Sequence, residues 1–256
     1  MVRSLLHTLV LVLALNAVSS RILSLRAQPP PLAVELLRSW RTGQQQRALH
    51  MPGLIFREHA IRRSSSPAGM QQLTVEAVVH GTPDTETWTR EILSVQSESP
   101  RRPAWPADST GLAWDLPGHP EIAHLTGLLT LPASLLDRLD VTGEATPDTI
   151  DGLACWRFDA VPARSADPVR RVTFWFTRAE NRLARTRLLL QHYEQRNDRP
   201  LRLTLEAVHH YERFQGLDLP VWRRFEGTRQ HFRRGRLFTD VVMLEARYSD
   251  FHLAGR

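Results

Sequence analysis

The chain has 256 residues, a hydrophobic fraction of 42% and a charged fraction of 23%, values that are ordinary for a globular protein and allow one large domain. All 33 basic residues are arginine, and the formal net charge is +6. The lone cysteine, Cys155, excludes an intramolecular disulfide, and we interpret it as a small buried hydrophobic residue rather than as a nucleophile.

Residues 1–20 have the pattern of a secretory signal peptide, with a basic Arg3, an apolar run over 5–18 and a small-residue end. The predicted cleavage is near residue 20, and as late as residue 27 in the alternative. Removing 1–27 takes away three arginines and no acid, so the net charge falls from +6 to +3, which does not indicate a nucleic-acid partner. We predict a periplasmic or otherwise exported protein, membrane-anchored if the signal is not cleaved.

The first elements after a Pro-rich spacer are a helix and three strands. Residues 31–41 predict a short helix with Leu32, Leu36, Leu37 and Trp40 on one side. The segments 53–63, 71–81 and 86–96 are strand-like and are joined by turn residues, which predicts an antiparallel meander.

The pattern then changes between residues 97 and 120. This stretch holds five prolines and two tryptophans, which predicts a long loop. Two short amphipathic helices are predicted next, over 120–129 and 132–140, each with a proline at its first position.

The rest of the chain is again strand-like, at 151–162, 169–177, 182–194, 199–214, 218–230 and 236–253. With the early meander, this makes about nine antiparallel strands. The predicted fold class is α+β: a large curved antiparallel sheet, or incomplete β-barrel, with a few helices packed in its concavity. Residues 32–256 would form a single domain with the Pro-rich loop at 97–120.

Residues 172–177 of the predicted strand 169–177 carry bulky apolar side chains on both faces. Alternate residues of a strand point to opposite sides. Trp175 stands on one face. The other face is dense enough to be a core or cavity wall, and we predict that it faces the concavity. The candidates for an apolar ligand-binding wall are three residues of this strand and two of the strand 199–214: Val172, Phe174, Phe176, Leu203 and Leu205.

Motifs for catalysis or cofactor binding are absent from the sequence: there is no nucleophile elbow, phosphate-binding loop, dinucleotide fingerprint, metalloprotease helix or C-x-x-C pair. We therefore predict no enzyme activity, no cofactor and no metal site. His209 and His210 are interpreted as surface or interface histidines rather than metal ligands. The arginine-rich segment 223–236 is interpreted as an edge hairpin with solvated arginines rather than as an RNA-binding patch.

Binding of an apolar ligand requires none of these motifs, since each buried CH₂ of an acyl chain contributes about 0.8 kcal/mol. The leading hypothesis is a non-enzymatic, periplasmic lipid- or lipoprotein-binding protein with an apolar cavity, whose partners are acyl chains and possible envelope proteins. The alternative is a structural or sensor-type module with a filled core, which binds a protein.

The order of elements resembles the LolA-like fold of the outer-membrane lipoprotein carrier and lipoprotein-sorting proteins. The resemblance rests on the N-terminal "LLRSW" helix, on "IDGLACWRFDAVP" after a glycine turn, on the hairpin "VTFWFTRAENRLARTRLLL" and on "YERFQGLDLPVWRRFEG". It implies an incomplete antiparallel barrel closed by helices, with an apolar cavity for acyl chains. Members of this family carry lipoproteins, bind glycolipids or act as periplasmic sensors.

Overall fold

The computed structural model describes residues 31–66, 69–83, 87–98, 131, 133–141, 143–164, 168–196, 199–233 and 236–255. The predicted signal peptide, the predicted helix over 120–129 and all of the predicted 97–120 loop except Ser97 and Glu98 lie outside these residues. Those two end a strand.

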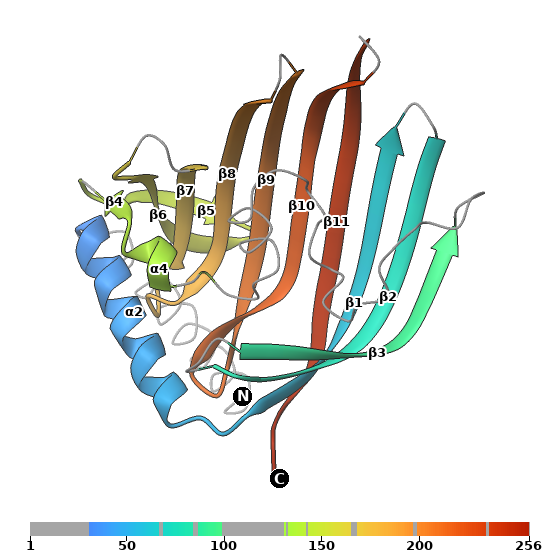
Figure 1. Ribbon diagram of the computed structural model, residues 1–256. Helices are drawn as coiled ribbons and strands as arrows, with labels where there is room; N and C mark the ends of the chain where they lie inside the picture. The colour runs from blue at the N-terminus through green and yellow to red at the C-terminus, as the bar shows by residue number, and fades with distance from the viewer. Residues whose placement is uncertain are drawn as a thin grey trace, which may run out of the picture.

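The described strands form one antiparallel sheet in the order β3-β2-β1-β11-β10-β9-β8-β7-β6-β4, with β5 also paired to β6. The sheet is curved and open, with β3 and β4 at its two ends (Figure 1), which confirms the predicted fold class. The N-terminal strands are β1 (Leu54–Ser66), β2 (Gly69–Thr82) and β3 (Thr87–Glu98). The others are β4 (Leu139–Val141), β5 (Thr146–Ile150), β6 (Leu153–Pro162), β7 (Val169–Thr177), β8 (Leu183–Arg196), β9 (Arg199–Phe214), β10 (Leu217–Arg233) and β11 (Arg236–Leu253).

Two helices are described, α2 (Ala33–Leu49) and α4 (Ala133–Leu136). Both lie at the β4–β8 end of the sheet (Figure 1). Leu36 and Leu37 of α2 are buried, as the sequence predicts, whereas Leu32 precedes the helix and is 46% exposed. We call the sheet face that α2 packs on the inner face and the opposite one the outer face.

The predicted helix over 132–140 is wrong in its second half. Only Ala133–Leu136 is helical, and Leu139 starts β4, which pairs antiparallel with the end of β6. Apolar spacing over so few residues fits a helix and a strand equally well, and the free edge of β6 decides between them. The sequence also missed β5, which pairs with β6 from Thr146 to Ile150.

The hairpin made by 223–236 does not lie at an edge, which corrects the sequence interpretation. Strand β11 pairs with β10 on one side and with β1 on the other, so this hairpin is in the middle of the sheet. Its arginines are therefore not all solvated: Arg223 is fully buried on the inner face. The local sequence holds no information about the β1–β11 pairing, since it joins segments that are far apart in the sequence.

Gly227 marks a close approach between β10 and β9 on the inner face. It stands opposite Leu205, and a Cβ atom there would lie 2.3 Å from the carbonyl oxygen of Thr204. Only glycine fits at such a distance, which allows Leu205 to cover the β10 backbone.

Candidate functional site

All five predicted ligand-binding residues lie on the inner face, in the main hydrophobic core. Their exposed fractions are Val172 0%, Phe174 0%, Phe176 0%, Leu203 5% and Leu205 0%. Trp175 lies on the other face in a separate small cluster with Cys155 and Ala184, which confirms the predicted division of this strand. Cys155 is buried, also as predicted, and burial raises the pKa of its thiol. The ligand-binding role of the five residues stays a prediction.

The phenylalanines of β7 pack as a stack beneath α2. The ring of Phe158 on β6 lies 5.2 Å from that of Phe174 and 5.8 Å from that of Phe176, and both pairs are stacked. Trp40 of α2 meets Phe176 edge-on at 5.9 Å. This end of the inner face is therefore a close-packed aromatic layer between sheet and helix.

The inner face remains apolar beyond α2, over the half of the sheet made by β10, β11, β1 and β2. Nine apolar side chains there are at most 6% exposed. They are Phe56, Ala60, Val75, Ala77, Val79, Phe225, Val242, Leu244 and Ala246. Apart from the contact of α2 with the start of β10, neither described helix lies over these strands (Figure 1). Apolar side chains of the inner face therefore extend well beyond the end that α2 covers.

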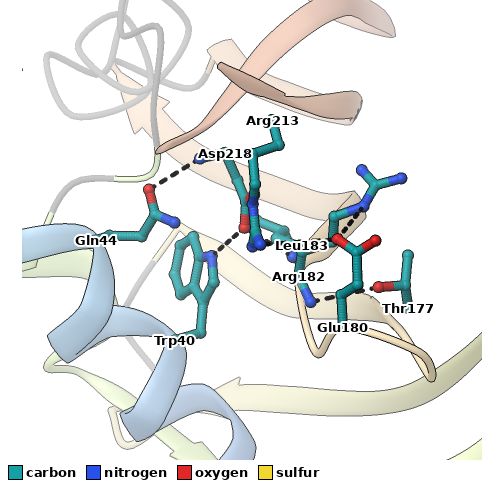
Figure 2. A network of polar contacts seen from close by, with 8 residues as sticks. All are labelled: Trp40, Gln44, Thr177, Glu180, Arg182, Leu183, Arg213 and Asp218. Carbon is teal, nitrogen blue, oxygen red and sulfur yellow. Dashed lines mark hydrogen bonds and ion pairs between the residues drawn. The ribbon is translucent and has the colours of Figure 1, made fainter. Parts of the chain in front are cut away.

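Asp218 fixes α2 to the sheet and is the centre of the network in Figure 2. Its Oδ2 accepts hydrogen bonds from Trp40 Nε1 of α2 at 2.9 Å and from the backbone N–H of Leu183 at 3.0 Å. Its Oδ1 accepts one from Arg213 Nε at 3.1 Å, and its own N–H donates to Gln44 Oε1 of α2 at 3.1 Å. We call this arrangement the α2 clasp, because one buried carboxylate joins the helix to three strands.

The rim of the α2 clasp is exposed and weaker. Glu180 in the β7–β8 turn lies 3.7 Å from both Arg182 and Arg213, and its side chain is 59% exposed (Figure 2). Ion pairs of this kind contribute little to stability, so the clasp depends on Asp218.

A second polar centre interrupts the apolar inner face away from α2. Glu58 of β1 is fully buried and is shared by two guanidinium groups. Arg90 Nε of β3 donates to Oε2 at 2.6 Å, and Arg223 Nη2 of β10 donates to Oε1 at 3.3 Å. We call Glu58, Arg90 and Arg223 the charge cluster. Burial alone would lower the pKa of Arg90, but the charge of Glu58, the neighbouring Tyr248 and the hydrogen bond to Glu58 together more than offset this, so the pKa is raised and the group stays charged.

Aromatic rings surround the charge cluster. The guanidinium of Arg223 lies 5.4 Å from the Phe225 ring and 5.5 Å from the Tyr248 ring, at cation–π distance. Burial raises the pKa of Tyr248, so its phenol is neutral at physiological pH. On β3, Trp88 packs edge-on against Phe56 at 5.7 Å.

Two donors on β3 next to this centre are buried and have no hydrogen-bond acceptor among the described residues. They are Nη2 of Arg90 and Nε1 of Trp88. The two residues lie on the same face of the strand, two positions apart. A buried donor that lacks an acceptor costs about 1–3 kcal/mol, more when it is charged, and buried polar groups are nearly always paired. These donors mark the place on the inner face where an acceptor would be stabilised.

His209 is a further polar side chain on the inner face. The interpretation of this residue as a surface histidine is wrong. It is 3% exposed, its Nδ1 lies 3.3 Å from the Thr186 hydroxyl, and its ring meets Phe225 edge-on at 5.6 Å. Burial, aided by the positive charge of Arg223, lowers the pKa of His209 to about 3. The imidazole is therefore neutral in the folded protein at neutral pH.

The stability of the protein should fall as the pH is lowered, in part because of His209. Between the folded pKa of about 3 and the ordinary value of 6.5, the unfolded chain binds a proton that the folded chain does not. The contribution of His209 to the free energy of unfolding is thus fully present above pH 6.5 and is lost toward pH 3. The free energy of unfolding changes by up to about 1.4 kcal/mol per pH unit over this range. Urea unfolding of wild type and His209→Gln at several pH values measures it.

We expect a flatter pH dependence in His209→Gln than in wild type. The matched control is His252→Gln, because His252 is exposed on the last strand. Parallel curves for wild type and His209→Gln would contradict the assignment.

The outer face holds a polar groove of about 490 Å³ lined by Arg185, Glu206, Val208, His210, Trp222, Arg224 and Glu226. Its arginines have carboxylate partners, for example Arg185 with Asp151 at 2.7 Å and Arg224 with Glu226 at 2.5 Å. The charges of the arginines in this groove are therefore largely balanced by carboxylates. In the charge cluster, by contrast, two arginines share one carboxylate.

Among the described residues, no group of three or more His, Cys, Asp and Glu side chains is arranged to hold a metal ion. In the same part of the chain, no helix has the length and apolar character needed to cross a membrane.

Sequence reasoning missed both polar centres. Asp218 lies in a turn-flanked segment, where an aspartate is expected to be solvated, and Glu58 and Arg223 stand in strands rich in exposed charges. One signal was present: along β10, Arg223 alternates in phase with Phe225, a large apolar residue of the kind that faces a core.

No family model matches the chain, and no curated protein matches it. Solved structures do resemble it. An outer-membrane lipoprotein-sorting protein domain from Vibrio parahaemolyticus is 11% identical with a TM-score of 0.36. The match covers 86% of this chain and 94% of that one. A LolA superfamily protein from Nitrosomonas europaea is 14% identical with a TM-score of 0.35 and the same coverage, 86% and 94%.

A DUF1329 family protein from Desulfovibrio piger is 10% identical with a TM-score of 0.33, over 84% of this chain and 93% of that one. Two of these structures bear the names of the group that the sequence resembles, a lipoprotein-sorting protein and a LolA superfamily protein. At these TM-scores and identities, the likeness concerns the fold and says nothing of function.

Proposed function

We propose that the protein is a non-enzymatic lipid- or lipoprotein-binding protein of the periplasm, in which the inner face of the sheet takes up acyl chains. The observation that supports this most is the extension of the apolar inner face beyond α2, from β10 to β2. An acyl chain on this surface gains about 0.8 kcal/mol per buried CH₂, on the order of 10 kcal/mol for a long chain before the costs of association.

The periplasmic location rests on the signal-peptide pattern of residues 1–20, and a single ligand-binding domain over 32–256 is part of the same proposal. Val172, Phe174, Phe176, Leu203 and Leu205 would form the end of the binding surface that α2 covers. An acyl chain would reach these residues only when α2 moves away from the sheet. The α2 clasp would therefore limit how far along the inner face a chain can bind.

Uptake of an uncharged apolar probe is the direct test. Ile92 of β3 stands opposite Ala77 on the inner face and is 39% exposed, so a substitution there leaves the buried core intact. We expect Ile92→Glu to weaken binding of the neutral fluorophore N-phenyl-1-naphthylamine about tenfold or more, because it places a carboxylate on the apolar surface.

The matched control is Val241→Glu, the same kind of change at a side chain that is 44% exposed on the outer face of β11. It should leave probe binding unchanged. No probe binding by wild type, together with no lipid in a solvent extract of the purified protein analysed by mass spectrometry, would refute the proposed function.

A sensor-type module that binds a protein is the second candidate, and the edge strand β3 favours it. Strand β3 ends the described sheet, and Leu93 and Val95 on it are 53% and 58% exposed. An apolar edge strand is a template for pairing with an extended segment of another protein. Cross-linking from Gln96→Cys that captures one envelope protein, with no lipid in the preparation, would favour this candidate over the first.

A further inference from the structure

The polar interruption of the inner face is hard to explain by stability alone. A carboxylate and two guanidinium groups have been removed from water in the charge cluster, and the cost of such desolvation can exceed the gain from mutual attraction. Hydrophobic side chains of similar volume would serve an apolar wall as well or better. Such a centre on a ligand-binding surface therefore suggests that the ligand has a polar part.

The donors that lack an acceptor indicate the charge of that polar part. Arg90 is 10% exposed at its side chain and uses Nε for Glu58, while Nη2 finds no acceptor in the part of the chain that the structure describes. Trp88 Nε1, on the same face of β3, also has none. Both groups donate and neither can accept, so they are suited to an oxyanion and not to a cation or an amine.

We infer that Arg90 and Trp88 form the head-group site for an anionic acyl ligand, a carboxylate or phosphate oxyanion whose chain lies on the apolar inner face. This inference rests on the proposed function and names its ligand class. Arg90 Nη2 and Trp88 Nε1 donate to the oxyanion, while Glu58 holds the Arg90 side chain in place through Nε. Ile92, at the next inner-face position of β3, is 39% exposed, so the apolar surface beside the two donors reaches solvent at the edge strand.

Two variants each remove one donor and are designed to leave the fold intact. Arg90→Gln removes the charge but leaves Glu58 paired with Arg223, so no isolated carboxylate is buried. Trp88→Phe removes only the N–H and keeps a ring against Phe56. The control is Arg57→Gln, which removes an arginine that is 68% exposed on the outer face of β1.

The experiment is isothermal titration calorimetry of the purified full-length chain at pH 8 with dodecanoate, with the uncharged 1-dodecanol and with acetate. Wild type should bind dodecanoate more tightly than dodecanol, and acetate not measurably. Arg90→Gln should lose about tenfold or more in dodecanoate affinity, and Trp88→Phe a smaller factor, while both bind dodecanol as wild type does. Arg57→Gln should change neither affinity.

Equal affinity of wild type for dodecanoate and dodecanol, unchanged in both variants, would overturn the inference and leave the proposed function standing. Binding of acetate as tight as that of dodecanoate would also overturn it, by showing a small-anion site that ignores the chain. If wild type binds neither long-chain ligand, the proposed function itself fails, and the inference with it.

Discussion

Asp218→Ala is expected to lower the free energy of unfolding by about 3–5 kcal/mol. Asp218 is buried and accepts hydrogen bonds from Trp40, from the N–H of Leu183 and from Arg213. Its removal leaves two buried donors without an acceptor and releases α2 from the sheet. Urea-induced unfolding followed by circular dichroism gives the difference between the variant and wild type.

The control for Asp218 is Glu180→Ala, since Glu180 contacts the same Arg213 but is mostly exposed. That variant should unfold at the wild-type urea concentration. A local readout is trypsin cleavage after the arginines of α2, which should be faster in Asp218→Ala than in either other protein. Equal stability of the Asp218 and Glu180 variants would mean that the clasp does not hold the helix.

Phe174→Ala should also be severe, with a loss of about 3–5 kcal/mol, because it removes a fully buried ring from the stack with Phe158 and Phe176. The loss combines the transfer free energy of the ring with the cavity left behind. Thermal and urea unfolding measure it. Val161→Ala on the neighbouring strand, at a side chain that is 49% exposed, is the matched control and should be nearly neutral.

The same Phe174→Ala variant tests the predicted ligand wall. If the aromatic layer is a filled core, the variant loses stability as stated and binds the neutral fluorophore as wild type does. If an acyl chain reaches this layer, the loss is clearly smaller and fluorophore binding falls. Unchanged stability together with unchanged binding would contradict the buried position of the ring.

Local periodicity was enough to predict most of the strands and the division of β7 into two faces. The six strands predicted from 151 to 253 match β6–β11 within a few residues, because alternation and turn residues are properties of short segments. The short strands β4 and β5 were missed, since three and five residues show no distinctive period.

The site was less predictable because it depends on which strands become neighbours. Glu58, Arg90 and Arg223 come from β1, β3 and β10, and they meet only because β11 pairs with β1. Charge in a strand sequence normally indicates a solvated face. Their burial follows from the pairing of strands that are distant in sequence, which no local pattern records.

The β1–β11 pairing also determines the order in which the molecule can be completed. Leu54 lies opposite Leu253, so the first strand of the sheet finds this neighbour only after the last has been synthesised. Until then the β1–β3 meander can exist only as a separate unit, with the open edge of β1 and half of the inner face exposed. Contacts of such high sequence separation slow folding and lengthen the time during which unpaired edges can aggregate. A chaperone or holding factor that shields β1 during synthesis would therefore raise the yield of the folded protein more than one that acts on the β6–β10 region, whose strands pair with sequence neighbours.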